Sequence, residues 1–160
     1  MSLALAAFAW TAVAAARAGY VNDRACASCH PAKYTSYQGV GMAQSMRRPR
    51  REVLIEDFGP FFHAASKTHY EMEWKDGKLL FHSHQLDAGG KRINVVDQQV
   101  DWIVGSGHRS RVYLYRTPSG EMYQLPIAWY TQEKKWGMAP GYDRPDHDGI
   151  TRQVRRECLF

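Results

Sequence analysis

The feature that most constrains this chain is a cysteine pair followed directly by a histidine, Cys26-Ala27-Ser28-Cys29-His30. Two thiols separated by two residues reach the two vinyl groups of a porphyrin and form thioethers, and the next residue offers an imidazole to the iron. This spacing is the attachment signature of c-type haem. It predicts one haem c bound covalently through Cys26 and Cys29, with His30 as the proximal iron ligand.

Two other chemistries use the same thiol pair. A thioredoxin-like redox pair needs a preceding strand in a βαβ unit, whereas a polar loop precedes Cys26. A zinc site needs a second pair of ligands. Such ligands could come, without a familiar zinc spacing, from His63, His69, His82, His84 and Cys158. A third interpretation is a sensing or interaction domain without haem, in which Cys26 and Cys29 form a disulfide.

Alternation of apolar and polar residues predicts strands. Tyr70, Met72 and Trp74 alternate with polar residues, and Asp76-Gly77 then forms a two-residue hairpin turn. Further strands are expected at 79–84, 93–96, 111–116 and 123–129, and Pro126 indicates that the last of these lies at a sheet edge.

Helices are expected at three places. Pro31 suits the first position of a helix over 31–37, Asp97 could cap a second that ends near 104, and a third covers 149–157. The expected fold is therefore α+β, with a short helical haem-attachment module followed by an antiparallel β-sheet of hairpins and an irregular C-terminal segment.

The N-terminus has the pattern of an export signal. Residues 3–16 are almost entirely apolar, and Ala16-Arg17-Ala18 is a small-x-small cleavage site, although no Lys or Arg precedes the apolar run. Export agrees with haem c, which is attached outside the bacterial cytoplasm. A periplasmic protein is expected, with membrane contact only if the N-terminal segment is retained as an anchor.

Composition and charge exclude some classes of protein. The 160 residues are 44% hydrophobic and 23% charged, which excludes a disordered tail and a polytopic membrane protein. The formal charge of +5 favours acidic partners. We expect redox partner proteins in the periplasm and no nucleic acid.

Three segments are expected along the chain: a signal peptide at 1–18, a haem-attachment module at 19–52 and a β-rich cytochrome domain at 53–160. Cys158 is the third residue from the end of the sequence. It reads as the start of a second, truncated Cys-x-x-Cys-His, which would make the chain an N-terminal fragment. The other interpretation of Cys158 is an incidental thiol.

Several stretches resemble a known family. Residues 26–34 and 41–46 resemble the first haem module of multihaem c-type cytochromes, the nitrifier-type tetrahaem cytochrome c domains that are often linked to tetratricopeptide repeats. Residues 105–108, 112–116, 125–130 and 140–147 look similar as well. The resemblance implies a periplasmic or surface electron carrier with several closely spaced haems. This chain departs from the family because it has one complete haem motif.

A low-spin haem needs a sixth ligand, which is His or Met. His108 follows a glycine-rich turn, His63 follows an aromatic pair, and two methionines lie near the attachment motif. The full set of candidate distal ligands is His108, His63, His69, Met42, Met46 and His147. Each of these also has an ordinary structural interpretation in a core or hydrogen-bond network.

Three clusters of polar side chains each have a functional and a structural interpretation. The basic linker contains Arg47, Arg48, Arg50 and Arg51. It could steer an acidic partner or bind haem propionates, and its structural interpretation is a solvated loop. The group Asp143, Asp146, His147 and Asp148 suggests a metal site, but a loop held by Asx turns and salt bridges is the preferred interpretation. The pair His82 and His84 binds a metal or is a surface strand pair.

The expected function is electron transfer by an exported c-type cytochrome. An electron carrier needs no acid, base or nucleophile, so no catalytic residue is assigned, and a carrier is favoured over an enzyme. The alternative is a fragment of a multihaem reductase or oxidoreductase with an open haem coordination site, where His108 or Arg109 would handle substrate.

Overall fold

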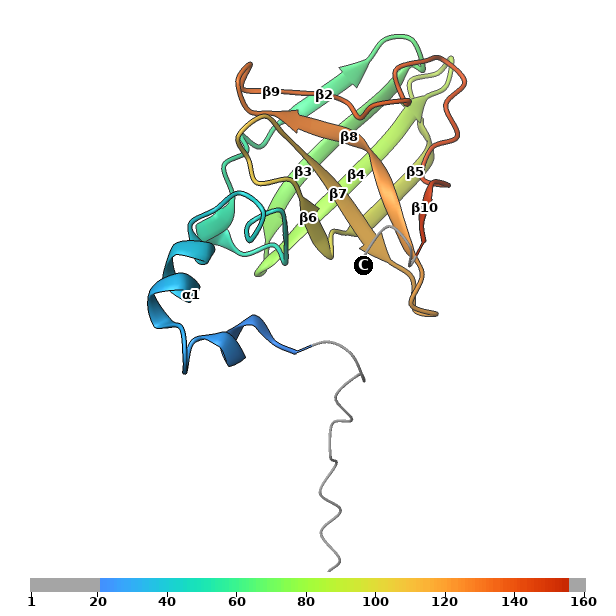
Figure 1. Cartoon of the computed structure of the whole chain (residues 1–160). Coiled ribbons are helices and arrows are strands. Elements are labelled where there is room, and N and C mark those ends of the chain that lie inside the picture. Colours follow the sequence, from blue (N-terminus) through green and yellow to red (C-terminus); the bar gives the residue numbers. More distant parts are fainter. Residues whose placement is uncertain (1–20, 156–160) are drawn as a thin grey trace, which may run out of the picture. The chain divides into compact units, whose positions relative to one another are not determined.

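The computed structural model describes residues 21–155 (Figure 1). The chain divides into two compact units, 1–37 and 38–160, and each is described here by itself. The expected signal peptide at 1–18 and Cys158 lie outside the described residues. Within 21–155, no helix has both the length and the apolar character that a membrane span requires.

The first unit contains two short helical elements. A 3-10 helix, η1 (Asp23–Cys26), starts at Asn22, whose side chain accepts a hydrogen bond from the Arg24 amide at 2.9 Å. The α-helix α1 (Pro31–Gln38) begins at a proline, which suits that position. It ends before Gly39, and none of its residues is buried. The predicted helix over 31–37 is confirmed.

The second unit is built almost entirely from antiparallel strands (Figure 1). One sheet has the strand order β1 (Met46–Arg47), β6 (Trp102–Val104), β7 (Ser110–Arg116), β8 (Met122–Tyr130), β10 (Gln153–Val154), and β9 (Lys135–Met138) also pairs with β8. The other sheet has the order β2 (Pro60–His63), β3 (Thr68–Lys75), β4 (Lys78–Leu86), β5 (Arg92–Gln99). A 3-10 helix, η2 (Arg51–Val53), precedes β2.

The two sheets share one apolar core. Alternate residues of a strand point to opposite faces, so Tyr70 and Met72 of β3 are buried while Glu71 between them is exposed. The buried cluster draws on both sheets, including Phe81 of β4 and Ile127 of β8. Figure 1 shows β6, β7 and β8 lying across β3, β4 and β5. The burial of these facing side chains therefore holds the sheets together.

The hairpin predicted at Asp76-Gly77 is confirmed. Both residues have positive φ, 49° and 74°, as a type I′ turn requires. The turn sets the pairing of Lys75 with Lys78 and, through it, of Met72 with Phe81 in the core.

The expected α+β class is wrong, because the described residues form a β-rich fold with a single short α-helix. The helix expected up to residue 104 is absent, and those residues belong to the end of β5 and to β6. The helix expected over 149–157 is also wrong, since β10 occupies part of it. In both places apolar residues pair with a neighbouring strand, and tertiary pairing overrides a weak local helix signal.

The module expected at 19–52 is likewise not helical throughout. Met46 and Arg47 form β1, whose partners in β6 are Val104 and Ile103. The Gly105 amide continues this contact by donating to the Ser45 carbonyl at 2.6 Å. The segment that follows α1 is therefore part of a sheet.

Pro126 does not mark an edge strand. Its strand, β8, pairs with β7 on one side and with β9 and β10 on the other. Pro126 lies between the residues that pair with β9 and those that pair with β10, and its carbonyl accepts a hydrogen bond from the Ala139 amide at 2.8 Å. The missing N–H of proline is accommodated where the ladder changes partner.

A buried ion pair lies within the second unit. Arg111 Nη1 donates to Glu56 Oε1 at 3.2 Å, and the two side chains are 3% and 1% exposed. The Tyr113 hydroxyl donates to the same oxygen at 2.9 Å. Burial and the Glu56 charge raise the pKa of Tyr113 well above its ordinary value, so the phenol stays protonated.

Replacing Glu56 with glutamine tests the role of this pair. Glu56→Gln leaves the Arg111 charge buried without a counter-ion, so we expect the free energy of unfolding to fall by about 3–5 kcal/mol. The control is Asp148→Asn, which removes the partner of the exposed Arg144 and should cost less than about 1 kcal/mol. Chemical denaturation measures both, and equal losses would contradict a structural role for the buried pair.

Candidate haem-attachment site

The cysteine–histidine motif occupies one continuous turn of backbone. Cys26 ends η1, and His30 directly precedes α1. The His30 amide donates to the Cys26 carbonyl at 2.9 Å, and the Tyr34 amide donates to the His30 carbonyl at 3.0 Å. These bonds fix the backbone on both sides of Cys29, so the spacing of the two thiols and the imidazole is set locally.

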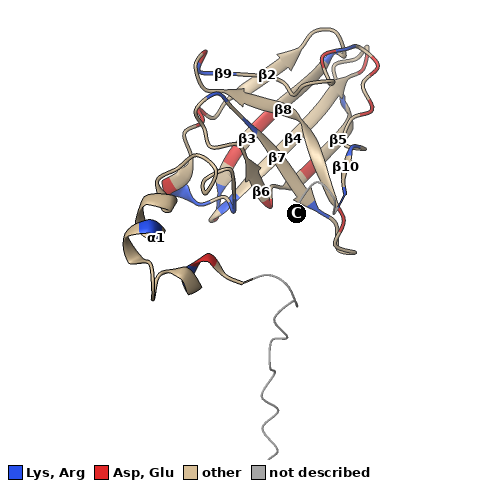
Figure 2. Ribbon diagram, in the orientation of Figure 1, with Lys and Arg blue, Asp and Glu red and all other residues tan. Residues whose placement is uncertain are grey.

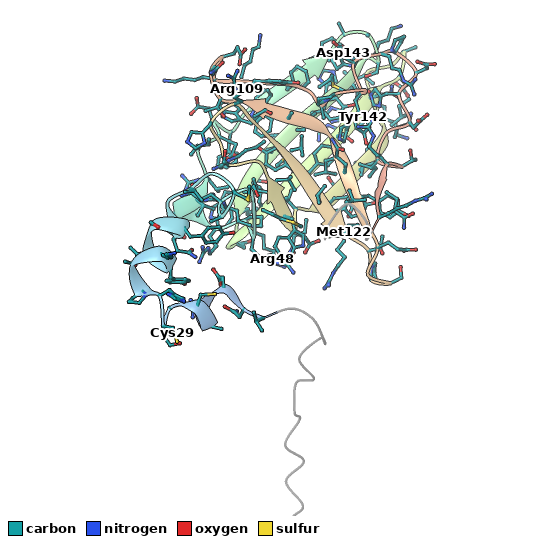
Figure 3. The ribbon with its side chains drawn as sticks, in the orientation of Figure 1. Cys29, Arg48, Arg109, Met122, Tyr142 and Asp143 are labelled. Carbon is teal, nitrogen blue, oxygen red and sulfur yellow. The ribbon has the colours of Figure 1, made fainter. Side chains whose placement is uncertain are left out.

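The three side chains of the motif are available for a cofactor. Cys26 and Cys29 are free thiols and are exposed, and Figure 3 shows the Cys29 sulfur at the outer side of the turn. His30 is exposed, and its ring makes no hydrogen bond to any residue within 21–155. Protein atoms therefore do not cover the thiols or the imidazole, and these residues fit a haem c.

Both ring nitrogens of His63 contact other side chains of the protein. It is buried at the end of β2, where Nδ1 lies 2.8 Å from Ser66 Oγ and Nε2 lies 3.1 Å from Asp143 Oδ1. Iron ligation by either nitrogen would break one of these bonds, so His63 is a poor candidate for the distal ligand. Phe62, directly before it, is exposed, and its ring is tilted against that of His69 with centroids 4.6 Å apart.

His147 is also committed through both nitrogens. Nδ1 accepts from the Gly149 amide at 3.1 Å, and Nε2 lies 3.1 Å from the Tyr70 hydroxyl. Burial, followed by the nearby His63 and Arg144, lowers the pKa of His147 below its ordinary value. The neutral ring is therefore the form that the fold selects.

Of the remaining candidates, Met42 and His108 lie near Gly41, whereas Met46 is in β1 and His69 is in β3. A Cβ on Gly41 would lie 3.6 Å from His108 Nδ1 and 3.5 Å from the Ser106 side chain. His108 is exposed, and its Nδ1 lies 2.9 Å from Ser106 Oγ. Met42 is 78% exposed, whereas Met46 is half-buried in β1. Of the candidate ligands, His108 and Met42 thus have the most accessible donor atoms.

The basic linker is only partly solvated. The Arg48 guanidinium lies over the Trp102 ring at 3.9 Å and pairs with Asp101 at 3.4 Å. Burial and the charges of Arg111 and Arg50 lower the pKa of Arg47, whose Nε donates to the Gln44 carbonyl at 2.9 Å. These contacts attach the linker to the sheet, and its role toward an acidic partner stays a prediction.

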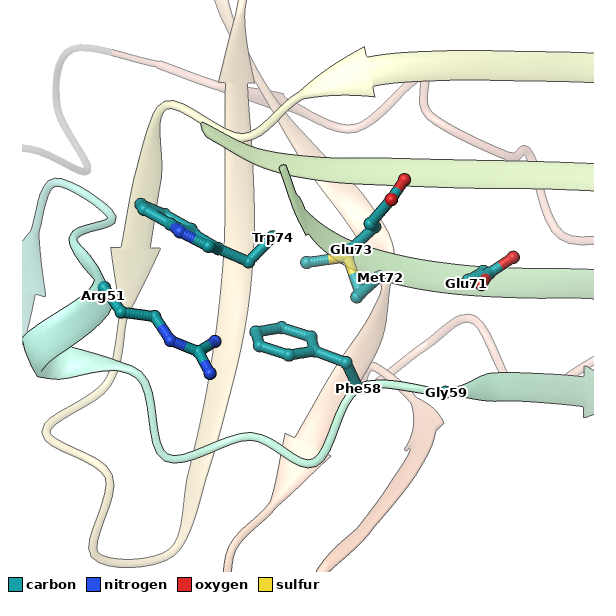
Figure 4. A pocket seen from close by; sticks show the side chains of 7 residues that line it. All are labelled: Arg51, Phe58, Gly59, Glu71, Met72, Glu73 and Trp74. Carbon is teal, nitrogen blue, oxygen red and sulfur yellow. The ribbon is translucent and has the colours of Figure 1, made fainter. Parts of the chain in front are cut away.

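A hollow of about 500 Å³ lies beside Arg51. Figure 4 shows the Arg51 guanidinium next to the Phe58 ring, with Trp74 opposite and the Glu73 carboxylate directed away from these rings. The Arg51–Phe58 separation is 5.8 Å. Sequence reasoning missed this hollow, because Trp74 reads as an ordinary core residue of a strand and nothing in the pattern brings Phe58 to it.

The acidic group near the C-terminal end has mostly structural contacts. Arg144 pairs with Asp148 at 3.4 Å and approaches Asp146 at 3.9 Å, while Asp143 bonds His63. This arrangement agrees with a loop held by ion pairs and hydrogen bonds.

No family model, curated protein or solved structure matches this chain. The resemblance to multihaem c-type cytochromes therefore stays a prediction, and the function must be argued from the residues themselves.

The environment of His147 predicts a pH effect on stability. The pKa of His147 is lower in the folded protein than in the unfolded chain. As the pH falls below the ordinary histidine pKa, the unfolded chain therefore binds a proton at this residue before the folded protein does. Stability should therefore decrease from that pH down to the folded pKa of His147, and His147→Gln should make the melting temperature less dependent on pH in this window. Nuclear magnetic resonance titration should give a midpoint below that of the denatured chain. A midpoint at or above that reference would contradict the assignment.

Proposed function

We propose that this protein is an exported c-type cytochrome that transfers electrons in the periplasm, with one haem c held by Cys26, Cys29 and His30. The observation that supports it most is the local turn that presents two free thiols and an imidazole in the order Cys-x-x-Cys-His, all three exposed. When bound, the haem supplies a reversible one-electron change between ferrous and ferric iron.

The first unit needs covalent attachment in order to keep such a group. No residue of α1 is buried, so the helix provides no apolar pocket that would retain a porphyrin by packing. Thioethers to Cys26 and Cys29 would hold the group without a deep cavity. The backbone bonds of His30 would orient its imidazole for the iron.

Among the candidate distal ligands, His108 keeps one ring nitrogen available for a metal. His63 and His147 use both ring nitrogens within the protein. In contrast, the tautomer of His108 that donates from Nδ1 to Ser106 Oγ leaves the Nε2 lone pair free. A histidine that binds a metal through one ring nitrogen is commonly oriented by a hydrogen bond from the other.

The charge of the chain supports an acidic redox partner. Lys and Arg outnumber Asp and Glu by 21 to 16. Figure 2 shows basic positions in the segment before β2, where the basic linker lies. Opposite charges on a partner would raise the association rate, and added salt would slow it.

Loss of one thiol tests haem attachment. Cys29→Ser, expressed with the haem-attachment machinery, should lose its double thioether linkage, since serine forms no thioether. Ser28→Ala is the matched control, because its hydroxyl contacts Cys29 Sγ at 3.8 Å but provides no attachment atom. The pyridine haemochrome spectrum, which distinguishes one thioether from two, measures the result, and haem that resists acid–acetone extraction shows covalent attachment. Complete extraction from the wild-type protein would refute the proposal.

Carbon monoxide binding tests the distal ligand. The reduced wild-type protein should resist carbon monoxide if a His or Met side chain fills the sixth position, and ready binding by His108→Ala would identify His108 as that ligand. His84→Ala is the control, since His84 lies on the other sheet in β4. Rapid binding by the wild-type protein would contradict the proposal and favour a reductase with an open coordination site.

A further inference from the structure

One imidazole nitrogen in the second sheet has no hydrogen-bond partner although protein atoms cover it. His82 lies in β4, and its Nε2 is buried and unpaired within the described residues. Buried polar atoms in native proteins are nearly always satisfied, so an unsatisfied one calls for an explanation such as a catalytic role, a water or an ion.

The other nitrogen of His82 is firmly held. Nδ1 lies 2.6 Å from Asp97 Oδ1 across the β4–β5 pair, where the two residues are direct partners. A carboxylate only accepts, so Nδ1 carries the proton. In the neutral ring this leaves the lone pair on Nε2. A histidine that binds a metal through one nitrogen and donates to a carboxylate through the other has this arrangement.

A second ligand lies within reach of that lone pair. Glu73 Oε2 is 3.6 Å from His82 Nε2, which is too long for a hydrogen bond. Two ligands about 2.0–2.2 Å from a tetrahedral zinc ion lie about 3.3–3.6 Å apart. The observed separation between Glu73 Oε2 and His82 Nε2 falls within this range.

The surroundings are acidic and open to solvent. His82, Glu73 and Asp97 line a hollow of about 440 Å³ that also includes Glu71 and Arg92. Glu71 is the direct partner of His82 in β3, so its carboxylate belongs to the same face. Figure 2 shows acidic positions among the strands of this region. Three carboxylates against one guanidinium give the hollow a negative charge that attracts cations.

We propose that this hollow is a zinc-type divalent metal site. His82 Nε2 and Glu73 are the ligands already directed toward each other, and Glu71 completes the site by rotation of its exposed side chain. As they stand, no three such groups of residues 21–155 converge on one point, so binding includes this rotation. Asp97 is a positioning residue, because its carboxylate holds Nδ1 of the His82 ring. The inference is independent of haem attachment.

Isothermal titration with Zn²⁺ on the full chain tests the site. His82→Gln should lose one zinc per chain, and Glu73→Gln should bind it at least tenfold more weakly. Asp97→Asn should weaken it by about 10- to 100-fold, because it disturbs the orientation and basicity of the ring. The matched carboxylate control is Glu133→Gln, in the exposed turn before β9, which should bind as the wild type does. Any zinc bound by Cys26 and Cys29 is the same in all variants, so it cancels when each variant is compared with the wild type.

Two results would overturn the proposal. In the first, His82→Gln and the conservative Glu73→Gln, both folded by circular dichroism, bind as much zinc as the wild type. In the second, zinc binding disappears in His84→Gln but not in His82→Gln. The stacked pair His69 and His84, whose ring centroids are 5.0 Å apart, would then be the site.

Discussion

The second unit depends on one constraint, which is that the inner faces of two antiparallel sheets must bury each other. β3 and β4 contribute alternate apolar residues from one sheet, and β7 and β8 contribute them from the other. The same alternation directs the remaining residues of β3 and β4 outward, including Glu71, Glu73 and His82. The core therefore determines which side chains are left to form surface sites.

The Cys-x-x-Cys-His motif, residues 26–30, has a different physical basis. Its geometry comes from a few local hydrogen bonds around Cys26 and His30, and it does not require the core. A covalent cofactor suits such a unit, since thioether bonds replace the apolar burial that a helix without buried residues does not supply.

The sequence predicted what local rules determine. The turn at Asp76-Gly77 and the strands on either side of it were predictable from backbone preference and alternation. The same local rules wrongly predicted a helix up to residue 104. Ile103 is extended because it pairs with a partner strand, β7, which local rules do not reveal. The same limit explains the incorrect α+β class, since strand pairing decides the structure of short ambiguous segments.

Hydrogen bonds between residues distant in sequence could not be predicted at all. His63 looked like an axial ligand because it follows two phenylalanines, yet Asp143, eighty positions away, engages its ring. In the sequence, His82 is one of two alternating histidines. In the structure, its Nδ1 contacts Asp97 while its Nε2 lies 3.6 Å from Glu73, so the two ring nitrogens have different surroundings. These contacts depend on register and on loop placement, which no short motif encodes.

One peptide tests the central claim most directly. Trypsin cleaves after Arg24 and Lys33, so the peptide Ala25–Lys33 contains both thiols and His30. Mass spectrometry of the protein exported from cells that attach haem should show this peptide heavier by one haem, joined at Cys26 and Cys29. A peptide from those cells that carries free thiols or a disulfide, with no added haem mass, would contradict the account.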